Sequence, residues 1–368
     1  MKILQISPHF SPNIGGVETH INDLVLGLVD KKHKVFVLAY KALQTKIASS
    51  VLERHKRLKI LRIPWLPGLF YTFVDKPILE FLYLFPGIFV VSSLIILFDR
   101  PDVIHAHGLV AGTTAVIWGK IFGIRTVIST HNIYNFPKSG FYSKFINWVL
   151  NKTDHILCLS HQSMGEIKKI VKDKNKISIF VSWVNLKKFK PLDKGESKKK
   201  LGWGKQFIVL FVGRLVPEKG ISELLSAAKL LSKGIKLKIA GSGPLESKVQ
   251  KYYIGKISQD DLSIYYSGAD IVIVPSTHDE GFGRVILEAL ACGTPIIASN
   301  RGAIPGVIDE TVGKLIDVTP INIKRAIEYF YNKPDKLKEL SKNTRKFVIK
   351  RYGDKNIEAI ISSYTSRV

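Results

Sequence analysis

Two carboxylates and two cations in the second half of the sequence carry the strongest chemical signal. Glu280 and Glu288 are separated by seven residues, across a glycine-rich turn and into a helical pattern. A carboxylate can accept two hydrogen bonds from sugar hydroxyls, so this pair could hold different ends of one ligand. Arg214 and Lys219 share a predicted strand-to-helix loop, where they could stabilise a departing diphosphate. Each feature alone is also typical of a solvated surface, and only together do they indicate a site.

Two glycines near the start of the sequence are further candidates. Gly15 and Gly16 follow the first predicted strand and open a helical pattern. Glycine lets the backbone turn tightly there, and it brings backbone N–H groups and the positive end of a helix close to an anion. Glycines at such a turn are as often structural, so both interpretations stay open.

Histidines mark the ends of two neighbouring strands in the first half. His105 and His107 end one predicted strand, and His131 lies just after the next. We expect strand alternation to place His105 and His107 on opposite faces, so that they cannot bind one metal ion. His107 lies nearer the strand end and is the better candidate for ligand contact. The sequence has no Asp-x-Asp motif, so we expect no catalytic divalent metal and no other cofactor. Cations and helix N-termini must then neutralise any phosphate.

Short β-branched runs alternate with longer helical patterns along both halves of the chain. The predicted strands cover residues 2–7, 35–39, 103–105, 126–130, 207–212, 236–240, 271–274 and 295–298. This alternation is typical of parallel sheets covered by helices. The sequence therefore predicts an α/β protein of two Rossmann-like domains, with the carboxyl ends of the strands facing a shared cleft.

Composition restricts the partners. The 55 lysines and arginines against 30 aspartates and glutamates give a formal charge of +25, which attracts nucleic acid, anionic lipid or phosphorylated molecules alike. The excess is spread over both halves and no nucleic-acid-binding motif occurs, so we expect no nucleic-acid partner. Cys158 and Cys292 lack disulfide or zinc spacing, and the first residues lack a signal-peptide core. These features favour a cytoplasmic protein.

One segment has the composition of a membrane helix. Phe81–Phe98 is eighteen residues long without a charge, but it contains Pro86 and Gly87 and lies between two predicted strands of one domain. We interpret it as a helix packed within that domain. A helix that also dips into a membrane interface remains an alternative, and a true span would disrupt the sheet.

Taken in order, these motifs resemble glycosyltransferase family four, the retaining glycosyltransferases of GT-B fold. The matching motifs are Gly15–Glu18, Asp102–His107, Thr130–His131, Gly213–Arg214, Glu218–Gly220, Gly241–Pro244 and Pro275–Ala289. They cover nearly the whole chain, and jointly they are highly specific.

The resemblance implies a role for each candidate. Arg214 and Lys219 would bind the donor diphosphate, Glu288 the ribose, and Glu280 with the backbone of Gly281, Phe282 and Gly283 the transferred sugar, while His107 would meet the sugar from across the cleft. The remaining donor-binding candidates are Gly15, Gly16, Gly213 and Gly243, and His131 is assigned to the acceptor. The implied reaction transfers a hexosyl unit from a UDP- or GDP-sugar with retention and without metal.

The alternation of strands and helices breaks around Phe189–Lys205 and restarts at Phe207, which suggests the domain limits, and the resemblance suggests that the last helix returns to the first domain. We assign residues 1–185 to an acceptor-binding domain, 186–205 to a linker, 206–350 to a nucleotide-sugar-binding domain, and 351–368 to a helix that packs back on the first domain. The sequence departs from the family pattern at Ser182–Asn185, where the turn into the linker must form without glycine, and at Gly302–Gly306.

The acceptor follows from charge and not from a motif. A strongly basic chain with an uncharged apolar run suits a lipid-linked glycan or glycolipid and peripheral contact with the cytoplasmic face of a membrane. Two alternatives remain, a transferase for a soluble sugar phosphate or small glycoside, and a catalytically silent subunit that binds nucleotide sugars.

Overall fold

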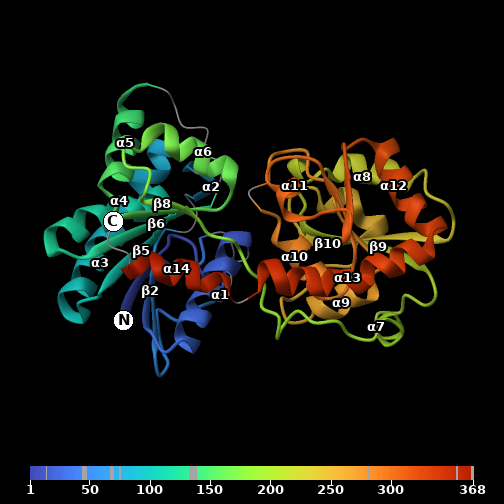
Figure 1. The fold of residues 1–368 in the computed structure, drawn as a ribbon, viewed down its shortest axis with the longest axis horizontal. Coiled ribbons are helices and arrows are strands. Elements are labelled where there is room, and N and C mark those ends of the chain that lie inside the picture. The colour runs from blue at the N-terminus through green and yellow to red at the C-terminus, as the bar shows by residue number, and fades with distance from the viewer. Residues whose placement is uncertain are drawn as a thin grey trace. The chain divides into compact units, whose positions relative to one another are not determined.

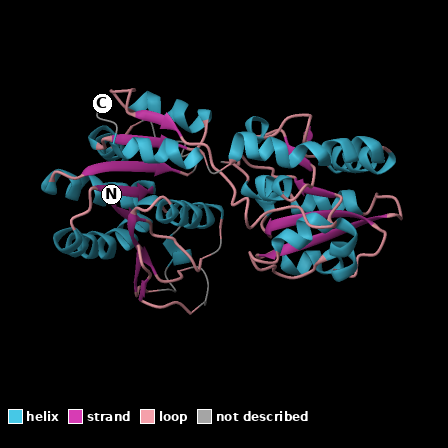
Figure 2. Cartoon of the chain, turned by 60° about the horizontal axis from the view of Figure 1, so that its bottom comes forward, coloured by secondary structure: helices cyan, strands magenta, loops and turns pink. Residues whose placement is uncertain are grey.

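The computed structural model describes residues 1–13, 15–43, 48–66, 70–73, 76–131, 139–280, 282–353 and 355–365. The chain forms two compact units, one of Met1–Ser182 with Lys355–Val368 and one of Trp183–Asp354 (Figure 1). Helices flank the strands of each sheet (Figure 2). The two parallel-sheet α/β domains predicted from the sequence are confirmed.

The first unit is built on a sheet in the order β3-β4-β2-β1-β5-β6-β7-β8, parallel except for the β3–β4 pair. Its strands are β1 (Lys2–Ile6), β2 (Lys34–Tyr40), β3 (Leu52–Arg54), β4 (Leu58–Ile63), β5 (Val103–His107), β6 (Arg125–Thr130), β7 (His155–Cys158) and β8 (Ile177–Ile179). Four of the five residues of the central strand β1 are buried, because a parallel sheet is covered on both faces.

The helices of the first unit connect these strands. They are α1 (Gly16–Asp30), α2 (Phe70–Phe73), α3 (Pro77–Asp99), α4 (Gly108–Phe122), α5 (Phe141–Lys152), α6 (His161–Ile170) and α14 (Asn356–Thr365). The uncharged run Phe81–Phe98 lies inside α3, and Leu84, Ile88 and Ile96 on that helix are buried in the core of this unit.

The last helix, α14, is part of the first unit although the chain has by then passed through the second. The Tyr364 hydroxyl lies 2.7 Å from Nδ1 of His105, and Arg125 Nε donates to the Ser363 carbonyl at 3.0 Å. A Cβ on Gly27 would lie 2.5 Å from Cδ1 of Ile357. The close approach of α14 to α1 therefore requires glycine at residue 27.

The second unit is built on an all-parallel sheet in the order β10-β9-β11-β12-β13. Its strands are β9 (Phe207–Arg214), β10 (Ile235–Ser242), β11 (Ile271–Val274), β12 (Ile296–Ser299) and β13 (Gly313–Ile316). Its α-helices are α7 (Lys194–Lys200), α8 (Ile221–Ala228), α9 (Leu262–Gly268), α10 (Arg284–Ala291), α11 (Ile304–Val307), α12 (Pro320–Asn332) and α13 (Pro334–Tyr352). One core cluster joins Phe211 and Ile273 of the sheet to Leu224 of α8 and Ile327 of α12.

Arg345 on α13 holds the start of the second unit against its α10 helix. Its guanidinium donates to the carbonyls of Phe189 at 3.0 Å, Ala291 at 2.8 Å and Leu186 at 3.2 Å. A planar guanidinium can satisfy three acceptors that lie in different directions, which a lysine cannot do in the same geometry.

We expect Arg345→Leu to lower the free energy of unfolding by about 2–3 kcal/mol, because three partly buried carbonyls lose a charged donor. Urea unfolding monitored by tryptophan fluorescence checks this. The control is Lys346→Leu, which changes the exposed neighbouring residue on the same helix. Equal stability of the two variants would show that the Arg345 hydrogen bonds contribute nothing.

Candidate functional site

Three loops of the second unit meet at the carboxyl edge of its sheet. Strand β9 pairs with β10 up to Ser242 and Arg214, and the Leu215 N–H donates to the Ser242 carbonyl at 2.9 Å. On its other side β9 pairs with β11, which ends at Val274 just before Pro275. Because parallel strands end at the same edge, the predicted motifs after β9, β10 and β11 come together there, where ligands of open α/β sheets bind.

Two glycines let these loops approach one another. A Cβ on Gly220, whose φ is +69°, would lie 1.8 Å from the Pro275 carbonyl oxygen. A Cβ on Gly243 would lie 2.5 Å from the Leu215 carbonyl oxygen. Any other residue would push the loops apart, so both glycines are explained by close packing of the site loops.

Lys219 and Glu280 form an ion pair across two of these loops. The Ser276 hydroxyl donates to the same carboxylate oxygen at 2.5 Å, and the Ala303 N–H donates to the Glu280 carbonyl at 2.9 Å. Burial alone raises the pKa of Glu280, but Lys219 and Ser276 lower it by more, so it lies below its ordinary value of 4.5. Glu280 is therefore charged at neutral pH.

Glu288 lies on α10 and is almost fully buried, with 3% of its surface exposed. The Tyr266 hydroxyl donates to its Oε2 at 2.9 Å, and Arg284 Nε lies 3.9 Å from its Oε1. Burial and the Glu288 carboxylate raise the pKa of Tyr266 well above its ordinary value of 10, which keeps the hydroxyl a donor. Sequence reasoning assigned no role to Tyr266 or Arg284. No motif marks Tyr266, whereas Arg284 stands one helical turn before Glu288.

The remaining candidates of the second unit lie at the end of β9 and at the start of α10. Gly213 and Arg214 are the last residues of β9, and Arg214 is exposed. Gly283, with φ +81°, precedes the first residue of α10, whose positive end favours anions. The ring of Phe282 packs edge-on against Tyr352 with 5.7 Å between centroids. Gly281 lies outside the described residues.

In the first unit, Gln5 determines which ring nitrogen carries the proton in a buried histidine cluster. Nε2 of His107 lies 2.7 Å from Oε1 of Gln5, and Nδ1 of His107 lies 2.9 Å from Nε2 of His131. An amide oxygen only accepts, so His107 carries its proton on Nε2 and its Nδ1 accepts from His131. Burial, together with His105 and His131, holds the pKa of His107 well below its ordinary value of 6.5. Both ring nitrogens of His107 are thus engaged within its own unit.

The expectation that His105 and His107 lie on opposite faces is wrong. Their ring centroids are 4.5 Å apart, because residues two apart in a strand share a face. His105 contacts Tyr364 through Nδ1 and Ser129 through Nε2, each at 2.7 Å. Within the described part of the chain, no group of three or more His, Cys, Asp or Glu residues could hold a metal ion.

The predicted anion site at Gly15 and Gly16 already has a carboxylate over it. Gly15 caps α1 in extended conformation and Gly16 begins the helix. A Cβ on Gly15 would lie 2.2 Å from Oε2 of Glu18, so this buried side chain folds back over the first turn. A carboxylate at the third helical position stabilises the positive helix end, and a bound anion would have to displace it.

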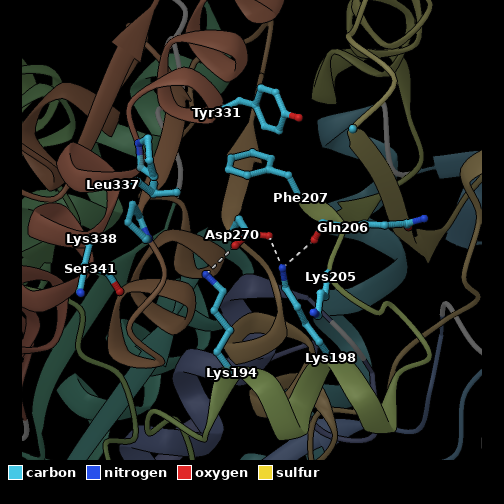
Figure 3. A pocket seen from close by; sticks show the side chains of 13 residues that line it. Lys194, Lys198, Lys205, Gln206, Phe207, Asp270, Tyr331, Leu337, Lys338 and Ser341 are labelled. Carbon is cyan, nitrogen blue, oxygen red and sulfur yellow. Dashed lines mark hydrogen bonds and ion pairs between the residues drawn. The ribbon is translucent and has the colours of Figure 1, made fainter.

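A cavity of the second unit lies at the other edge of the sheet. It has a volume of about 730 Å³ and lies where Phe207 begins β9 and Asp270 precedes β11 (Figure 3). Asp270 pairs there with Lys194 at 2.8 Å and Lys198 at 2.6 Å, and it accepts the Ile208 N–H at 2.7 Å. These contacts attach α7 to the sheet. The cavity is therefore separate from the loops that carry the predicted site.

Comparison with known proteins identifies both halves of the chain. Residues 14–188 match the model described as Glycosyltransferase Family 4, and residues 193–347 match the model described as Glycosyl transferases group 1. Together with the fold, these matches define a GT-B hexosyltransferase that uses nucleotide sugars. More particularly, the chain belongs to the family-four type of glycosyltransferases, which confirms the resemblance drawn from its motifs.

Two relatives and one solved structure illustrate the similarity. The phosphatidylinositol N-acetylglucosaminyltransferase GPI3 subunit of Saccharomyces cerevisiae is 27% identical over 350 residues, which is 87% of this chain and 72% of that protein. The GDP-mannose-dependent alpha-(1-6)-phosphatidylinositol dimannoside mannosyltransferase of Mycobacterium tuberculosis is 25% identical, over 91% of this chain and 89% of that protein. Sucrose-phosphate synthase from Thermosynechococcus elongatus has a TM-score of 0.81 with 23% identity, and covers 98% and 97% of the two chains.

The histidine cluster predicts acid sensitivity of the first unit. Burial lowers the pKa of His105 to about 3 and of His131 to about 4, from an ordinary 6.5. The unfolded chain therefore takes up these protons first, so their contribution to stability is present above pH 6.5 and is lost as the pH falls towards 4. As the pH falls from 6.5 to 5, we expect the loss of stability per buried histidine to rise from about 0.7 towards about 1.4 kcal/mol per pH unit, because the unfolded-state histidine is half protonated at pH 6.5 and nearly fully protonated at pH 5.

Urea unfolding at a series of pH values measures this slope. We expect His131→Asn to reduce the slope of unfolding free energy against pH by the contribution of one histidine, because the unfolded variant no longer binds a proton at residue 131. The control is His161→Asn, at an exposed position of the same unit, which should leave the slope unchanged. A wild-type slope retained in the His131 variant would contradict a neutral buried His131.

Proposed function

We propose that this protein is a retaining, metal-independent glycosyltransferase that transfers a hexosyl unit from a UDP- or GDP-sugar to a lipid-linked acceptor at the cytoplasmic face of a membrane. The observation that carries the proposal is the Lys219–Glu280 pair, a partly buried cation and anion held together at the carboxyl edge of the sheet. A sugar diphosphate needs both signs of charge, a cation for its phosphates and a carboxylate for its hydroxyls.

The charges suit the bond that breaks. When the bond from the anomeric carbon to the diphosphate oxygen breaks, the leaving group gains negative charge, which Lys219, Arg214 and the first turn of α10 would stabilise. The acceptor oxygen would then bond to the anomeric carbon on the face that the diphosphate leaves, and its proton would pass to the departing phosphate oxygen. Such a reaction retains the anomeric configuration and uses cationic side chains in place of a metal ion.

The two carboxylates would hold different parts of the donor. Glu280 is charged at neutral pH and could accept hydrogen bonds from hydroxyls of the transferred sugar. Glu288 is held by Tyr266 and Arg284 inside the unit, and a fixed carboxylate loses little entropy when it accepts bonds from a ribose. The relatives named for phosphatidylinositol derivatives support a lipid-linked acceptor.

A donor screen tests the reaction. UDP-glucose, UDP-N-acetylglucosamine, UDP-galactose and GDP-mannose would be offered with EDTA, using a membrane extract as the source of acceptor. We expect UDP or GDP release from one donor, dependent on the extract, and an α-linked product by NMR. Activity that EDTA abolishes would contradict metal independence, and nucleotide binding without release from any donor would favour a silent binding subunit.

Substitutions separate the two parts of the donor site. We expect Lys219→Met to lower kcat by about 10²–10³-fold with a smaller change in donor KM, because its charge acts mainly on the leaving group. Glu288→Ala should instead raise donor KM by roughly tenfold, because it removes ground-state binding. Lys229→Met, at an exposed position after α8, is the matched control. Unchanged kinetics in both site variants, with native circular dichroism, would overturn the assignment.

A further inference from the structure

The outer side of α3 is apolar along its whole length. At 1.5 Å per residue its 23 residues span about 34 Å. Six large apolar side chains on it are exposed by 51–86%, namely Ile78, Leu82, Val90, Leu94, Leu97 and Phe98. The helix is apolar enough to cross a bilayer by composition, yet only 33% of its most apolar stretch is buried. A core helix of a soluble domain would be mostly covered.

The neighbouring helices continue this surface. Phe89 of α3 stacks on Trp118 of α4 with 4.5 Å between ring centroids, and Phe81 of α3 meets Phe145 of α5 edge-on at 5.2 Å. The three helices lie next to one another along one side of the first unit (Figure 1).

Exposed apolar side chains on α4 and α5 enlarge the patch. Ile121 at the end of α4 is 62% exposed, and Phe141 and Trp148 of α5 are 86% and 40% exposed. We call the exposed apolar residues of α3, α4 and α5 the apolar face. Exposed apolar side chains gathered on three packed helices mark an interaction surface.

Positive charges surround the apolar face. Lys76 and Arg100 flank the two ends of α3, Lys120 precedes the exposed end of α4, and Lys144 lies on α5 between Phe141 and Trp148. Two acidic residues lie on α3: Glu80 in its first turn is partly buried, and Asp99 at its last residue pairs with Lys59 at 3.1 Å, so the cations predominate around the face. An apolar centre with aromatic residues and a cationic rim is complementary to an anionic lipid surface.

We propose that the apolar face inserts shallowly into an anionic bilayer and holds the first unit on the membrane. Self-association through this face would bring together two copies that each carry +25 charge, which electrostatic repulsion opposes. Full crossing of the bilayer would remove Leu84, Ile88 and Ile96 from the core that α3 shares with the sheet. Membrane binding through this face does not depend on the proposed function. Only the statement that the membrane carries a lipid-linked acceptor rests on it.

Vesicle flotation tests the surface without any donor or acceptor. We expect the wild-type chain to float with vesicles of equal parts phosphatidylcholine and phosphatidylglycerol, and to bind phosphatidylcholine alone much more weakly. The double variant Leu94→Glu and Phe98→Glu should lose roughly tenfold or more of this binding, because two charges would have to enter the apolar region. Both side chains are exposed, so the fold should not change.

A matched control moves the same substitutions to the other unit. Leu230→Glu with Ile349→Glu replaces apolar side chains that are 48% and 51% exposed, and it should bind vesicles like the wild type. Lys120→Gln with Lys144→Gln should weaken binding several-fold at low salt and little at high salt, because screening removes the attraction.

Several results would overturn the proposal. They are equal flotation of the apolar-face variant and the wild type, equal loss in the control variant, or a wild-type dimer that the Leu94 and Phe98 changes convert to monomer without affecting flotation. Nucleotide release tells the two proposals apart. Flotation without release from any donor would contradict the proposed function alone, and release from a membrane extract without flotation would contradict the membrane surface alone.

Discussion

The parallel pairing of β9 between β10 and β11 is the constraint on which the second unit depends. Parallel pairing in one register makes the three strands end together, so three loops that are distant in sequence meet at one edge. The loops can meet only because Gly220 and Gly243 leave room for neighbouring carbonyls. Lys219 and Glu280 then come into contact, and each charge neutralises the other in a partly buried position.

The two units use polar burial in opposite ways. The second unit encloses charges, with Glu280 partly buried against Lys219, and Glu288 almost fully buried and held by Tyr266 and Arg284. The first unit buries neutral rings whose proton positions follow from the amide of Gln5. Charged pairs suit a ligand that carries phosphate. A neutral network holds side chains in fixed orientations without attracting ions, and it is stable only where the histidines stay unprotonated.

Sequence reasoning predicted the α/β fold and the loops that carry the candidate residues, because strand periodicity and strand-end motifs are local signals. It could not show that Lys219 and Glu280 contact each other, since that contact depends on which strands are neighbours. Tyr266 was missed because a buried partner of Glu288 carries no pattern of its own. A single glutamine in the apolar strand β1 was a usable signal for Gln5 and was overlooked. The prediction that His105 and His107 lie on opposite faces was wrong, because residues two apart in a strand point to the same face.

The hydrogen bond between Tyr364 and His105 joins residues 259 positions apart in the chain. During synthesis, β5 and its histidines leave the ribosome long before their last partner exists, and the whole second unit is made in between. Until α14 has been synthesised, the surface of the first sheet that it covers, including His105, is therefore exposed to water. The second unit can complete its own core during this interval, so the unit that starts first is the one that finishes last.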